Sequence, residues 1–127
     1  MAIVTRVEIN PTFQNALNVD DNHQPIQVPR GTNQLQWNLT GNTTLQFYPL
    51  NDPNYPGFKW VDTPPYGVFD PPTLQGNGGT LQIGVNNGAA GGPWRYQLNA
   101  HDNMGVRYST YYTTATATTN DPAIKNN

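Results

Sequence analysis

The residues that could perform nucleophilic or acid–base chemistry are few in this chain of 127 residues, and their surroundings differ from those of catalytic groups. Cysteine is absent, and the only serine, Ser109, lies in a Tyr-Ser-Thr run rather than in the Gly-x-Ser-x-Gly turn that exposes an attacking hydroxyl. Paired-carboxylate hydrolysis needs two facing acids. Glu8 is the only glutamate, and six of the seven aspartates adjoin Pro, Asn or another Asp, as turn-forming residues do. We therefore expect no catalytic residue and a protein that is not an enzyme.

Two histidines stand in acidic, amide-rich runs, Asp20-Asp21-Asn22-His23 and His101-Asp102-Asn103. Two such loops at one end of a fold could share an ion, and their oxygen ligands would suit calcium better than zinc. Turns in which Asp and Asn bond their own backbone explain both runs equally well, and the twelve-residue calcium loop pattern is absent. We predict neither a metal nor a cofactor.

The segment 48–72 combines seven prolines with most of the aromatic side chains of the middle of the chain. Proline removes a ladder donor, so regular strand pairing can occupy only a short part of it, at 58–61. Its rings could fold back over the core, or they could form a stacking platform for sugars or a partner surface, with Asn amides supplying hydrogen bonds. The predicted ligand contacts are Tyr48, Asn51, Asn54, Tyr55, Trp60, Tyr66 and Phe69.

Alternation of apolar and polar residues with a period of two predicts the strands that must position these side chains. The alternating or β-rich runs are 3–9, 26–28, 35–39, 45–47, 58–61, 81–85, 94–100 and 106–112, and the Thr-rich continuation to 119 extends the last. Residues 94–118 form a predicted hairpin around the turn Asp102-Asn103-Met104-Gly105, and 120–127 should be a frayed tail. We expect one all-β domain over 1–127, a two-sheet antiparallel sandwich of about seven strands, with Trp37, Trp94, Tyr96 and Tyr108 in its core.

The C-terminal third resembles the last two strands of immunoglobulin-like sandwiches, in which a Trp or Tyr on the penultimate strand packs inward and a tight turn leads to a long edge strand. The ending Asp-Pro-Ala-Ile-Lys-Asn is similar to that of small uncharacterised bacterial domains of this shape. The Cys-Trp-Cys framework of true immunoglobulin domains is missing. The resemblance therefore implies an architecture and no functional residue.

The composition excludes some partners. Charged residues make up 11% of the chain, the net charge is −2, and the six basic residues form no run, so we expect no nucleic acid. No stretch approaches the ~20 apolar residues of a membrane helix, and the N-terminus lacks a signal-peptide pattern. We expect no membrane association and a cytoplasmic location by default, although the composition resembles that of extracellular or capsid proteins.

The function that these patterns favour is a non-catalytic binding or interaction module that contacts a glycan or a protein through the aromatic-rich loop 48–72. The alternative is a structural or assembly protein, such as a capsid-decorating or filament subunit. The low charge of the chain and its abundance of Asn, Thr and Gln favour that alternative. In it, copies of the chain would associate through the edge strand predicted at 106–118.

Overall fold

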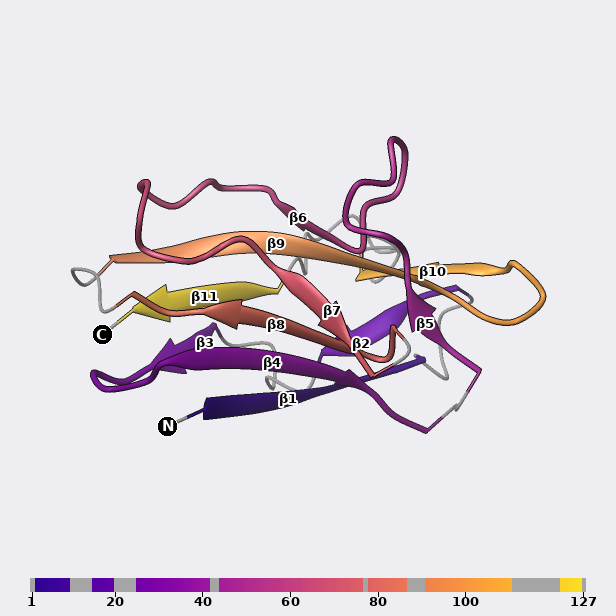
Figure 1. Ribbon diagram of the computed structural model, residues 1–127, viewed down its shortest axis with the longest axis horizontal. Coiled ribbons are helices and arrows are strands. Elements are labelled where there is room, and N and C mark those ends of the chain that lie inside the picture. The colour runs from indigo at the N-terminus through magenta and orange to yellow at the C-terminus, as the bar shows by residue number, and fades with distance from the viewer. Residues whose placement is uncertain are drawn as a thin grey trace.

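A computed structural model describes residues 2–9, 15–19, 25–41, 44–76, 78–86, 91–110 and 122–126, which form eleven strands in two sheets (Figure 1). The first sheet has the order β2-β1-β4-β8-β7 and comprises β1 (Ala2–Ile9), β2 (Leu17–Val19), β4 (Gln34–Leu39), β7 (Thr73–Gln75) and β8 (Thr80–Gly84). The second has the order β10-β9-β11-β3, with β5 and β6 also paired to β9, and comprises β3 (Ile26–Val28), β5 (Gln46–Phe47), β6 (Phe58–Trp60), β9 (Gly91–His101), β10 (Arg107–Ser109) and β11 (Ala123–Asn126).

The register of β4 against β8 shows how the sequence pattern produces a buried face. Leu35 pairs with Ile83 and Trp37 with Leu81, and all four side chains are buried. Because successive side chains of a strand point to opposite faces, the intervening amide residues of β4 and β8 lie on the other side of the sheet. The alternation in the sequence therefore decides which face of the first sheet meets the second.

The two sheets share one hydrophobic core, and Trp37 joins them at its centre. Its Nε1 donates a hydrogen bond to the Tyr96 hydroxyl over 2.9 Å, and the two rings meet edge to face at 5.3 Å between centroids. Both side chains are fully buried. A buried indole N–H requires such an acceptor, because an unpaired buried donor costs about 1–3 kcal/mol. This arrangement is consistent with a sandwich, as predicted.

The pairing is more varied than an antiparallel sandwich of about seven strands. β1 runs parallel to β4, and β3 runs parallel to β11, while the other strand pairs are antiparallel. The larger number of strands arises because β2, β7 and β11, of three or four residues each, lie outside the runs identified in the sequence. Strands this short leave too little alternation in the sequence to be recognised. The likeness to immunoglobulin domains stays a prediction.

The C-terminus corrects a second prediction, because part of the expected frayed tail is a strand. β11 lies between β9 and β3, and Ile124 is fully buried in the core. The backbone N–H of Tyr96 donates to the Pro122 carbonyl oxygen over 2.9 Å. The buried Ile124 and two neighbouring strands are enough to fix this segment.

The predicted hairpin is present as β9 and β10, and its turn projects at one end of the molecule (Figure 1). The Asp102 Oδ1 atom accepts hydrogen bonds from the backbone N–H groups of Met104 and Val106, both over 2.9 Å, and so closes the turn. Tyr96 is a core residue as predicted, whereas Trp94 and Tyr108 are only half-buried. The strand β10 ends at Ser109, and the part of the predicted long strand from 111 to 119 lies outside the described residues. Within the described ranges, no helix is long and apolar enough to span a membrane.

Candidate functional site

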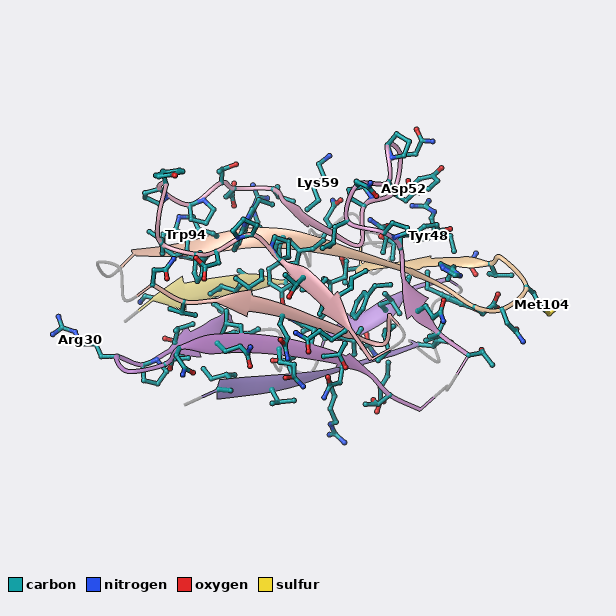
Figure 2. The ribbon with its side chains drawn as sticks, in the orientation of Figure 1. Arg30, Tyr48, Asp52, Lys59, Trp94 and Met104 are labelled. Carbon is teal, nitrogen blue, oxygen red and sulfur yellow. The ribbon has the colours of Figure 1, made fainter. Side chains whose placement is uncertain are left out.

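The structure divides the predicted ligand contacts among three places. Tyr48, Asn51, Asn54 and Tyr55 lie in the connection from β5 to β6, Trp60 lies in β6 with the Phe69 ring beside it, and Tyr66 lies on a separate turn. Figure 2 shows Tyr48 and Asp52 toward the β10 end of the molecule and Trp94 toward the opposite end. The segment 48–72 is therefore not one continuous platform.

The middle group covers the core rather than facing a ligand. The Trp60 ring lies 4.9 Å from Phe58 and 5.4 Å from Phe69, measured between centroids, and Phe69 lies 5.7 Å from Trp94. Phe58 in turn stacks on Tyr96 at 5.3 Å with an interplanar angle of 13°. These rings form a continuous series from the centre of the core to its edge, and Trp60 and Phe69 are half-buried within it.

The first group forms, with two residues of the hairpin, a cluster that we call the Tyr48 cluster: Tyr48, Tyr55, His101 and Arg107. The Tyr48 ring meets His101 edge to face at 4.9 Å and lies 5.9 Å from the Tyr55 ring. The guanidinium carbon of Arg107 lies 3.9 Å from the centroid of the Tyr55 ring, within the range of a cation–π interaction. Strand pairing explains the assembly, because His101 lies opposite both Arg107 of β10 and Gln46 of β5.

The loop that carries this cluster is fixed by its own hydrogen bonds. The Asp52 Oδ1 atom accepts from the backbone N–H groups of Asn54 over 2.9 Å and Tyr55 over 2.7 Å, a turn that Asp side chains favour. The Nδ2 group of Asn99 donates to the Pro56 carbonyl oxygen over 2.9 Å. Gly57 follows, and any side chain there would collide with the carbonyl oxygen of Tyr48. The position of the Tyr55 ring is therefore set by contacts within the protein itself.

The surroundings of the cluster favour the neutral form of two tyrosines, Tyr48 and Tyr108, and the ionised form of Asp102. Burial raises the pKa of Tyr48 above its ordinary value of 10.0, and the charges of Asp52 and Tyr55 act in the same direction while Arg107 partly opposes them. Burial, the Asp102 charge and a hydrogen bond to Asp102 raise the pKa of Tyr108. The backbone N–H of Val106 lowers the pKa of Asp102, as do the bonds from Met104 and Tyr108. Near neutral pH the phenols can thus donate hydrogen bonds, and they are poor nucleophiles.

Four of the seven predicted ligand contacts have exposed side chains, three in the β5–β6 connection and one on the later turn. Tyr55 is 41% exposed, Asn51 and Asn54 are exposed beside it, and Tyr66 is fully exposed. Tyr66 lies in a tight turn in which the Val68 N–H donates to the Pro65 carbonyl oxygen over 3.3 Å.

The chain beside that turn is fixed to β9. Arg95 forms a forked ion pair with Asp62, with Nε to Oδ2 at 2.7 Å and Nη2 to Oδ1 at 3.0 Å. The side-chain hydrogen bond from Arg95 holds the pKa of Asp62 below its ordinary value, with help from the Arg95 backbone N–H and charge. Together with the buried Val68, this pair holds the Tyr66 turn in place.

Two of the residues weighed for other chemistry, Ser109 and His101, lie on the hairpin strands β10 and β9. Ser109 is buried in β10, and its backbone N–H donates to the Asn15 carbonyl oxygen over 3.0 Å. The Nδ1 atom of His101 lies 3.0 Å from the Asp102 carbonyl oxygen. In the part of the chain that the structure describes, no three His, Asp or Glu side chains gather as a metal site would require. His23 lies outside the described residues, so a shared ion between the two His loops stays a hypothesis.

Sequence reasoning missed three residues that position this site: Asn99, His101 as a ring partner, and Arg107. The register of the hairpin was the available signal, because a turn over 102–105 places His101 opposite Arg107. The sequence did not indicate the role of Asn99, because its hydrogen-bond partner, Pro56, lies in the distant β5–β6 connection. No protein-family model matches the sequence, and neither the curated proteins nor the solved structures include a match.

Proposed function

We propose that this protein is a non-catalytic binding module that contacts a glycan through the Tyr48 cluster and the amides beside it. One observation carries the proposal: the Tyr55 ring is fixed by Arg107 at 3.9 Å and by Tyr48 at 5.9 Å, yet it is 41% exposed. A large ring that is both fixed and open is a ready surface for stacking.

The chemistry around this ring suits a polyhydroxylated ligand. Asn51 and Asn54 are exposed, and each amide supplies two N–H donors and a carbonyl acceptor, which match sugar hydroxyls. Arg107 lowers and Asp52 raises the pKa of the same Tyr48 phenol, so a positive and a negative charge both lie near the cluster. This balance favours a neutral ligand over a strongly anionic one.

Preorganisation adds to the argument. A rotamer-rich side chain that becomes ordered on binding loses about 0.5–1.5 kcal/mol of affinity. The bonds from Asp52 and Asn99 fix the loop in the free protein, so less of this loss occurs when a ligand binds.

The test is a glycan array followed by calorimetric titration of any glycan that binds, with Tyr55→Ala and Tyr66→Ala compared. Both substitutions remove an exposed tyrosine from the same segment, but only Tyr55 belongs to the cluster. We expect Tyr55→Ala to weaken binding by about tenfold or more, as for a hot-spot tyrosine whose truncation costs about 2 kcal/mol or more, and Tyr66→Ala to leave it unchanged. An array without binders, or equal affinities for the two variants, would contradict the proposal. A protein captured by the native chain and lost with Tyr55→Ala would instead identify a protein partner for this surface.

The alternative is a structural or assembly protein. It is supported by the low content of charged residues and by the position of β10 at the end of its sheet order. The N–H of Ser109 is already bonded to Asn15, so this position of β10 is not open for pairing with a second copy. Light scattering after size exclusion tests this alternative, because a monomer at every concentration is incompatible with it.

A further inference from the structure

The outer face of the first sheet carries a patch of uncharged hydrogen-bonding side chains, which we call the amide face: Gln34, Gln36, Asn38, Gln75, Thr80 and Gln82. The register places Gln36 opposite Gln82 and Asn38 opposite Thr80, and Gln75 pairs with Thr80 from the other side. These residues alternate with the buried side chains of β4 and β8, so they share the face that points away from the core.

Hydrogen bonds link the amide face into one network across three strands. Gln34 Nε2 donates to Gln82 Oε1 over 3.1 Å, and Gln82 Nε2 donates to Gln36 Oε1 over 3.1 Å. Gln36 Nε2 and Thr80 Oγ1 both donate to Asn38 Oδ1, over 3.0 and 3.1 Å. Gln75 Nε2 also donates to Gln82 Oε1. The network therefore holds long side chains in fixed positions on the outer face of the sheet, where Gln75 is exposed and the other five side chains are half-buried.

Fixed amides are costly to assemble and useful to a ligand. Ordering a Gln side chain costs rotamer entropy, and the network has already imposed that order. Each donating amide uses one of its two N–H groups in the network, so the second is directed elsewhere. A ligand with closely spaced hydroxyls could bond to these groups without ordering them.

The charge of the surface restricts the class of ligand. None of the six side chains of the amide face is ionisable, and the neighbouring strand β1 contributes Arg6 and Glu8, which have opposite charges. Arg6 lies opposite Asn38 in the parallel register. The amide face therefore has no excess of positive charge that would attract a phosphorylated or acidic polymer. The only large exposed apolar side chain of β1 is Val4, so an apolar protein surface would also find little to cover.

We propose that the amide face binds a neutral polysaccharide chain, whose hydroxyls donate to and accept from the ordered Gln and Asn side chains. This surface is on the first sheet, whereas the Tyr48 cluster is built on the second, so the inference does not depend on the proposed function above. A hydroxyl both donates and accepts, as a side-chain amide does, which makes the two chemically complementary.

The experiment is co-sedimentation of the full chain with insoluble neutral polysaccharides, namely cellulose, chitin, starch and a β-1,3-glucan, with an acidic polysaccharide, alginate, as the charged comparison. The test variant is the double substitution Gln36→Ala and Gln82→Ala, which removes the centre of the network. The matched control is Gln27→Ala, which removes an exposed glutamine side chain from β3 of the second sheet. We expect at least one neutral polymer to sediment the native chain, the double variant to bind about tenfold or more weakly, and the control to bind as the native chain does.

A measurement on the native chain keeps the inference testable if the double variant does not fold. Titration with a soluble oligosaccharide of a polymer that binds, followed by nuclear magnetic resonance, should shift side-chain amide signals of β4 and β8. Failure of all four neutral polymers to sediment the chain would overturn the inference. So would shifts confined to the Tyr48 cluster, or equal binding by a folded double variant, either of which would leave the proposed function standing without a second surface.

Discussion

Gly57 has no room for a side chain, and Gly57→Ala therefore tests whether the backbone fixes the loop that carries the Tyr48 cluster. A Cβ atom at this position would collide with the carbonyl oxygen of Tyr48, which is backbone and cannot rotate away. Two hydrogen bonds flank the contact: Gly57 N–H donates to the Pro49 carbonyl oxygen over 3.3 Å, and Asn99 N–H donates to the Gly57 carbonyl oxygen over 3.1 Å. Relief of the collision must therefore stretch the loop away from β9.

The size of the effect follows from these contacts. Overpacking costs about 1–3 kcal/mol, and each lost hydrogen bond about 1 kcal/mol. We expect Gly57→Ala to lower the free energy of unfolding by about 2–4 kcal/mol, where each kcal/mol lowers the Tm by roughly 3–6 °C for a domain of this size. Urea and thermal unfolding measure the loss, and glycan binding should weaken in parallel because Tyr48 moves with the loop.

The control for this substitution is Gly79→Ala. The nearest atom to a Cβ at Gly79 is the Gly76 carbonyl oxygen at 3.5 Å, an ordinary van der Waals distance, so we expect a change within about 0.5 kcal/mol. Equal stabilities for the alanine variants at positions 57 and 79 would refute the claim that the loop is fixed by its backbone.

Three further predictions concern single side chains. Tyr96→Phe leaves the buried Trp37 N–H without its acceptor and should lower the free energy of unfolding by about 1–3 kcal/mol in urea titrations; a change below about 0.5 kcal/mol would contradict a structural role for that bond. Tyr66→Ala should change stability by less than about 0.5 kcal/mol by the same assay, since the side chain is fully exposed, and a larger loss would mean that its ring packs in solution. The pKa of Asp102 is lowered in the folded state, so its contribution to stability is present above the unfolded pKa, near 4, and is lost as pH falls through the lower folded value. Asp102→Asn should flatten the acid limb of stability measured against pH, whereas an unchanged limb would show that the turn bonds do not favour the ionised form.

The sequence predicts those strands in which the period of two runs for several residues. β4, β8 and β9 each alternate long enough for their buried faces to be read directly, and Trp37 and Tyr96 lie in the core as expected. The parallel pairing of β1 with β4 could not be predicted in this way, because the two strands are distant in sequence. The residue pattern of neither strand indicates which strand it pairs with. Local patterns therefore define the faces of strands but not their neighbours.

The candidate site shows the same division at the level of side chains. Composition identified the segment 48–72, yet Trp60 and Phe69 pack into a ring series while Tyr55 and Tyr66 stay exposed. The difference depends on how each residue lies relative to β9, which the prolines of the segment do not reveal. Ile124 was missed for a related reason, since a single apolar residue in a short C-terminal segment has no period to mark its burial.

The strand β9 joins the core and the Tyr48 cluster, and its register determines both. Leu98 and Ala100 are buried in the core, while Asn99 donates from its Nδ2 group to the Pro56 carbonyl oxygen and accepts at its own carbonyl oxygen from the Tyr48 N–H over 3.1 Å. A slip of one residue would exchange these two sets, exposing apolar side chains and removing the bonds that fix the loop. The large free energy of core burial thus also specifies the position of the exposed ring, even though that ring contributes little to stability. For this reason we expect substitutions that shift β9 to weaken ligand binding before they unfold the domain, whereas truncation of Tyr55 alone should weaken binding at unchanged stability.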